Sequence, residues 1–67
     1  MKKDYSWTGK KGRYWIQFDK LDDGKMRAQA SPVGPGGGWT GPIAKKTADT
    51  DDEAERLLLD ELRQLNA

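Results

Sequence analysis

The sequence predicts a single small α+β domain over residues 1–67, with a three- to four-stranded antiparallel sheet and one C-terminal α-helix packed on one face. Three observations support this class: an amphipathic C-terminal segment, two alternating segments joined at a glycine, and a glycine- and proline-rich stretch before the helix. We expect the sheet within roughly residues 4–46, a flexible loop at 32–42 and the helix at 51–65. A chain of this length forms one domain with a small core.

The helix begins with a capping box. The hydroxyl of Thr50 can accept from the amide of Glu53, and the carboxylate of Glu53 can reach back to the amide of Thr50. The apolar stripe expected to face the sheet consists of Ala54, Leu58, Leu62 and Leu65, flanked by Leu57. Leu59 lies about 100° around the helix from Leu58. It is either a margin of the core or a partner contact, and we favour the core.

Residues 13–19 and 25–31 alternate in polarity around Asp22-Asp23-Gly24, which predicts a hairpin. A two-residue turn would pair Phe18 with Gln29 and mix the faces. A three-residue loop with Gly24 left-handed pairs Phe18 with Ala28, and we choose it because register follows the buried face. The side chains expected to face the helix are Tyr14, Ile16, Phe18, Met26, Ala28 and Ala30. Those expected on the other face are Trp15, Gln17, Asp19, Arg27, Gln29 and Ser31.

Two further strands are predicted from weaker patterns. Residues 4–8 alternate with Tyr5 and Trp7 on one side, which is compatible with an additional N-terminal strand. Residues 43–46 suit a short edge strand, where Pro42 is tolerated. The outward Trp15 either packs against a loop or serves as an aromatic anchor for a partner.

Composition excludes several functions. The chain has no cysteine and no histidine, so disulfides, thiolate zinc sites, cysteine nucleophiles and histidine bases are ruled out. The acidic pairs at 22–23 and 51–52 suit a turn and a helix start, and neither has a nucleophile or base beside it. We therefore expect no enzyme activity, no catalytic residues, no cofactor and no metal site. No apolar run is long enough to span a membrane, the lysines at the N-terminus precede no apolar segment, and a cytoplasmic location is expected.

Charge is divided unevenly along the chain. Residues 1–46 carry ten Lys/Arg against four acids, a net of +6, whereas residues 47–67 carry two Arg against seven acids, a net of −5. One interpretation is a basic sheet neutralised by its own acidic helix; the other is a cationic surface that binds phosphates while indoles stack on bases. The candidate nucleic-acid-binding residues are Lys10, Lys11, Arg13, Trp15, Gln17, Arg27, Gln29, Trp39, Lys45 and Lys46.

Residues 12–18, the turn 23–25 and the run from Thr50 to Leu58 resemble the arm-binding N-terminal domain of phage-type tyrosine integrases. This resemblance implies a sheet that enters the DNA major groove, with Trp15, Gln17, Arg27 and Gln29 facing the DNA, in a protein from a phage or mobile element. The glycine loop is long for that family, and we expect no catalytic domain to follow. The segments Gly24-Lys25-Met26, Gly36-Gly37-Gly38 and Thr40-Gly41, with the leucine-rich terminal helix, also resemble small archaeal chromatin proteins, which bind DNA through a sheet. A hairpin followed by residues 50–54 and an apolar helix is similar to HicB-type antitoxins, which bind a toxin protein.

These observations predict a DNA-binding module whose partner is double-stranded DNA, acting as a monomer or weak homodimer through the edge near Ile43. The alternative, from another class, is a small inhibitor or adaptor that docks on a host protein or toxin through its acidic helix or its Trp-bearing loop.

Overall fold

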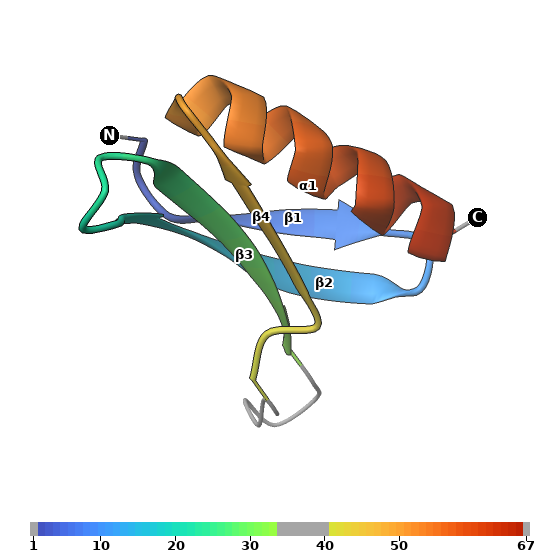
Figure 1. The fold of residues 1–67 in the computed structure, drawn as a ribbon. Helices are drawn as coiled ribbons and strands as arrows, with labels where there is room; N and C mark the ends of the chain where they lie inside the picture. Colours follow the sequence, from blue (N-terminus) through green and yellow to red (C-terminus); the bar gives the residue numbers. More distant parts are fainter. Residues whose placement is uncertain (1, 34–40, 67) are drawn as a thin grey trace.

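The computed structural model describes residues 2–33 and 41–66, which form a four-stranded antiparallel sheet and one C-terminal helix (Figure 1). The strands lie in the sheet in chain order, each paired with the next. Their bounds are β1 Tyr5–Gly9, β2 Gly12–Lys20, β3 Met26–Val33 and β4 Ala44–Ala48, and the helix is α1 Asp51–Leu65. The predicted α+β class is confirmed, and the additional N-terminal strand is present as β1.

The hairpin has the predicted register. Phe18 pairs with Ala28 and Ile16 with Ala30. The amide of Leu21 donates to the carbonyl of Lys25 at 2.8 Å, so residues 22–24 form the three-residue loop. Gly24 has a φ of 87°, a region that a residue without Cβ adopts at little cost. The apolar side chains of β2 and β3 therefore lie on the same face of the sheet.

Strand boundaries differ from the prediction by one or two residues. β3 continues through Pro32 and Val33, which pair with Tyr14 and Arg13, so the predicted loop begins later than expected. Pro32 is tolerated because β4 pairs with β3 from Met26 to Ala30, so Pro32 lies on a part of β3 that has no paired strand on that side among the described residues. β4 begins at Ala44 rather than at residue 43. Residues 34–40 of the predicted loop lie outside the described residues.

The helix begins as predicted and packs against β3 and β4. The hydroxyl of Thr50 accepts from the amide of Glu53 at 3.2 Å. The carboxylate of Glu53 lies instead 3.7 Å from the guanidinium of Arg56, so only half of the capping box is formed. The buried stripe follows steps of four residues and consists of Ala54, Leu58, Leu62 and then Asn66. The assignment of Leu65 to the core was wrong, since its side chain is 47% exposed.

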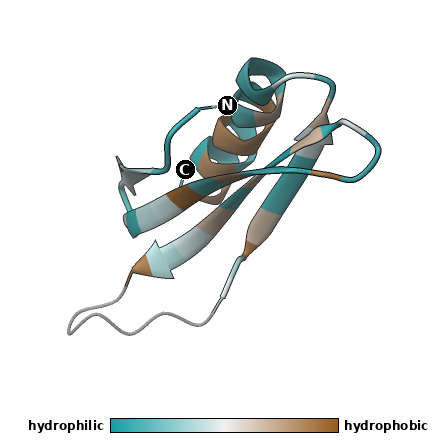
Figure 2. Ribbon diagram, turned by 90° about the vertical axis from the view of Figure 1, so that its left-hand side faces the viewer, coloured by the Kyte–Doolittle hydropathy of each residue, from teal (hydrophilic) through white to brown (hydrophobic). Residues whose placement is uncertain are grey.

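The core lies between the helix and one face of the sheet. All six residues that the register was expected to bury are buried, and Leu59 packs against them as the prediction favoured. Tyr5 and Trp7 extend this layer onto β1, where their rings approach Phe18 and Tyr14 at centroid distances of 6.2 and 5.9 Å. Hydrophobic and hydrophilic bands follow one another along the strands, and the helix lies on one side of the sheet (Figure 2).

Candidate nucleic-acid interface

The face of the sheet opposite α1, here called the open face, carries side chains from all four strands. Strand pairing places them in rows that cross the sheet. Its members are Ser6 and Thr8 on β1, Arg13, Trp15, Gln17 and Asp19 on β2, Arg27, Gln29, Ser31 and Val33 on β3, and Lys45 and Thr47 on β4, together with Ile43 just before β4. Six of the ten residues predicted to bind nucleic acid lie on it: Arg13, Trp15, Gln17, Arg27, Gln29 and Lys45.

Trp15 occupies the middle of the open face. Its direct cross-strand neighbours are Ser6 on β1 and Ser31 on β3, both small. The indole is 38% exposed, whereas Ser31 was expected to be open and is only 1% exposed. Continuing the register beyond the Ala30–Ala44 pair brings Ile43, 48% exposed, to the other side of Ser31. A small side chain between two large ones loses its solvent contact, which explains why the alternation of polarity did not predict this burial.

The predicted ion pair between Asp19 and Arg27 is formed. Arg27 Nη2 lies 3.2 Å from Asp19 Oδ2, and Gln29 Nε2 donates to the same oxygen at 3.3 Å. Asp19 is the sole acid among the open-face residues described. Its carboxylate positions the side chains of Arg27 and Gln29, which are two of the predicted nucleic-acid-binding residues. Two buried polar atoms on this face, Arg27 Nε and Ser31 Oγ, have no hydrogen-bond partner among the described residues.

Lys45 and Lys46 are adjacent in the chain but lie on opposite faces of β4. Lys45 pairs with Gln29 on the open face, is exposed and forms no salt bridge within residues 2–33 and 41–66. Lys46 points to the helix side, where its Nζ lies 3.4 Å from Glu61 Oε1. The segment that forms β4 is five residues long and alternates little in polarity. The sequence therefore did not predict that Lys45 and Lys46 lie on opposite faces of the sheet.

The helix carboxylates neutralise cations on their own side of the molecule. They pair with Lys2 and Lys46, and the outer surface of α1 adds a series of internal pairs between Glu53, Arg56, Asp60 and Arg63. Arg13 and Lys45 on the open face have no such partner among the described residues. The sequence allowed the interpretation that the acidic helix neutralises the basic sheet. This interpretation is correct for the helix side of the sheet and incorrect for Arg13 and Lys45 on the open face.

The remaining candidates lie elsewhere. Lys10 and Lys11 form the turn between β1 and β2, at the margin of the sheet near Arg13. The backbone amide of Lys11 donates to Asn66 Oδ1 at 2.7 Å, while its side chain is exposed. Trp39 lies outside the described residues.

The segment before β1 is attached to the start of α1 by charged contacts that the sequence did not predict. Lys2 Nζ lies 2.8 Å from Asp52 Oδ1 and 3.1 Å from Glu55 Oε1. The hydrogen bond to Asp52, with that to Glu55 second, raises the pKa of Lys2 above its ordinary value. Tyr5 donates its hydroxyl to Glu55 Oε2 at 2.8 Å. Burial, supported by this hydrogen bond, raises the pKa of Tyr5 to about 12.

Asn66 connects the end of α1 to the sheet. Its side chain accepts from the amide of Lys11 and donates to the carbonyl of Leu62 at 2.7 Å and to the hydroxyl of Tyr14 at 3.4 Å. Sequence reasoning missed it, although an asparagine directly after the last apolar residue of a helix is a recognised end signal. Gly9 is required beside it, because a Cβ there would lie 2.7 Å from Asn66 Oδ1.

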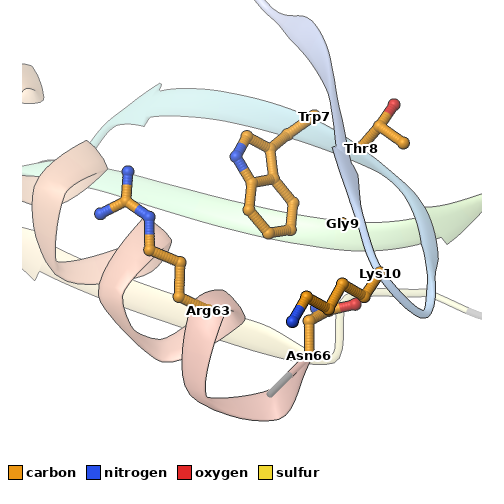
Figure 3. Close-up of a pocket in the computed structure, with 6 residues that line it drawn as sticks. All are labelled: Trp7, Thr8, Gly9, Lys10, Arg63 and Asn66. Carbon is orange, nitrogen blue, oxygen red and sulfur yellow. The ribbon is translucent and has the colours of Figure 1, made fainter.

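A shallow hollow of about 570 Å³ lies beside Asn66, between β1 and the last turn of α1 (Figure 3). It is lined by Trp7, Thr8, Gly9, Lys10, Arg63 and Asn66. The Asn66 amide is fully engaged by the protein, and Arg63 bonds to Asp60. Two of its polar side chains, Asn66 and Arg63, are thus already bonded within the protein.

No group of three or more acidic side chains within the described ranges is arranged to hold a metal ion. No helix in the same part of the chain is long and apolar enough to cross a membrane. No family model, curated protein or solved structure matches the chain. The resemblances to integrase, chromatin and antitoxin domains therefore stay predictions.

Proposed function

We propose that this protein is a small non-enzymatic module that binds nucleic acid through the open face of its sheet and the basic residues beside it. The observation that supports the proposal is the placement of the unneutralised cations Arg13 and Lys45 around an exposed Trp15, on the side of the sheet away from the acidic helix. Cations at such a surface contact phosphates, while an indole offers a face to a base or sugar.

The outer surface of α1 supports a protein partner less well. Its charges are matched internally between Glu53, Arg56, Asp60 and Arg63, and Leu65 is the single large apolar residue that the described helix exposes to a substantial extent. A docking surface on a protein is normally built around a cluster of buried aromatic or apolar anchors. The open face carries Trp15 and Ile43 and is the better candidate for any partner.

The adjacent lysines of β4 provide the test. We would measure the affinity of the wild-type protein, Lys45→Gln and Lys46→Gln for a labelled oligonucleotide by fluorescence anisotropy over a range of salt concentrations. The logarithm of the binding constant should fall linearly with the logarithm of the salt concentration, by about 0.9 for each phosphate contact on duplex DNA and about 0.7 on a single strand. Lys45→Gln should reduce the steepness by about one contact, while Lys46→Gln should leave it unchanged.

The two variants carry the same change in charge, so a difference between them reports the face and not the net charge. Loss of the exposed pair between Lys46 and Glu61 should cost at most about 1 kcal/mol, and the control should remain folded. Equal effects of the two substitutions, or no binding by the wild-type protein at low salt, would refute the proposal.

A further inference from the structure

The side chains of the open face bear on which nucleic acid it can accept, if the proposed function holds. The paired strands are staggered: β1 pairs with the first half of β2, and β4 pairs with β3 from Met26 to Ala30, so all four meet in the single row that contains Ile16 and Ala30. At Trp15 the sheet is therefore three strands wide, or about 10 Å between the outer strand axes. The major groove of B-DNA is about 12 Å wide, so the width of the sheet does not separate duplex from single strand and the choice rests on the side chains.

The position of Trp15 favours unpaired bases. Its two cross-strand neighbours are serines, so no large side chain stands directly opposite the indole on β1 or β3. The other aromatic residues of the described strands, Tyr5, Trp7, Tyr14 and Phe18, lie on the helix side and pack with one another or with the core. An indole that is 38% exposed and has no aromatic neighbour on its face can stack on a base whose face is free, whereas bases in a duplex are already stacked on their neighbours.

The next row of the open face supplies polar groups at a suitable distance. Gln17 on β2 pairs with Gln29 on β3, which in turn pairs with Lys45 on β4. This row lies two residues along β2 from Trp15, or about 7 Å. A base on the indole would have amide groups near its edge, and its phosphates would be within reach of the ammonium of Lys45 or the guanidinium of Arg13.

From these observations we infer that the open face binds single-stranded nucleic acid in preference to duplex, with one base stacked on Trp15. The shared ligand chemistry is an unpaired base attached to a phosphate backbone, which both single-stranded DNA and single-stranded RNA provide. This inference rests on the proposed function and narrows it, because the sequence led us to expect double-stranded DNA.

The test compares the affinity of the wild-type protein for oligothymidylate, oligouridylate and a DNA duplex of equal length at the same salt concentration. We expect at least one single strand to bind more tightly than the duplex, and the tighter of the two identifies the source. Duplex binding that equals or exceeds that of both single strands would overturn this inference and leave the proposed function standing. Absence of binding to all three would overturn both.

Substitution of Trp15 tests the stacking step. Trp15→Ala should weaken binding of the preferred single strand about ten-fold, while Trp15→Phe, which keeps an aromatic face, should retain most of the affinity. Trp7→Phe alters an indole on the helix side and should leave affinity unchanged. Circular dichroism checks that each variant is folded. Equal affinities of Trp15→Ala and the wild-type protein would refute stacking on Trp15. The preference for single strands is tested on the wild-type protein and therefore does not depend on the folding of any variant.

Discussion

Lys45 and Lys46 show how one step along a strand changes the role of a charge. The first lies among neutral amides on the open face, while the second is paired with Glu61 on α1. Arg27 is a third case, since it lies on the open face but is already bonded to Asp19. Phosphate binding by Arg27 must compete with that carboxylate, so Arg13 and Lys45 are the stronger candidates.

The phenol of Tyr5 leads to a prediction about the stability of the protein at alkaline pH. Its pKa is raised by burial and by the hydrogen bond to Glu55, to about 12, against an ordinary value of about 10. A group whose pKa is raised on folding contributes stability that is present below the unfolded value and is lost as pH rises through the folded value. The wild-type free energy of unfolding should therefore fall more steeply than that of Tyr5→Phe between about pH 10 and 12.

Denaturant unfolding at several alkaline pH values gives the two curves. Lys2 also has a raised pKa and shares Glu55 with Tyr5, but it is present in both proteins, so the difference between the curves reports the phenol of Tyr5 together with its coupling to Glu55 and Lys2. Parallel curves over this interval would show that the phenol of Tyr5 is not held in the environment described.

At the scale of the elements, Asn66 joins α1 to the β1–β2 turn and to Tyr14. Asn66→Ala should lower the free energy of unfolding by about 2 kcal/mol, because it leaves the amide of Lys11 and other partly buried groups without a partner. Gln64→Ala is the matched control, since Gln64 is exposed on the same turn, and it should change stability by less than about 0.5 kcal/mol. Similar losses in the two variants, measured by denaturant unfolding, would contradict the role given to Asn66.

The elements also show what the sequence could predict. The hairpin register was predictable because Phe18, Ala28 and Gly24 leave one arrangement that buries a single face. The helix start was predictable from the Thr50 cap. Its end at residue 65 also agrees with the prediction. The last buried position was harder to predict, because the buried positions continue in steps of four to Asn66, whereas the apolar character of Leu65 suggested a step of three. Asn66 is the buried position because its side chain bonds to the β1–β2 turn, and the sequence does not reveal this tertiary contact.

At the scale of the whole molecule, the division of charge along the sequence corresponds only in part to a division in space. The carboxylates of the acidic helix form ion pairs with Lys2, Lys46 and the arginines of the helix itself. They therefore neutralise only part of the positive charge of residues 1–46. The open face could be predicted as far as Trp15 and Arg27, since both belong to the hairpin. The contributions of β1 and β4 to it depended on pairings that short, weakly alternating segments do not specify.

The central claim is that the open face, and not the helix side, contacts nucleic acid. Two-dimensional NMR of the ¹⁵N-labelled protein during titration with an oligonucleotide tests it most directly, because Trp15 and Trp7 carry indole N–H groups on opposite sides of the sheet. The indole signal of Trp15 and the amides around Gln29 and Lys45 should shift, while the indole of Trp7 and the amides of α1 should stay in place. Shifts concentrated on α1 and Trp7, with Trp15 unchanged, would contradict the account.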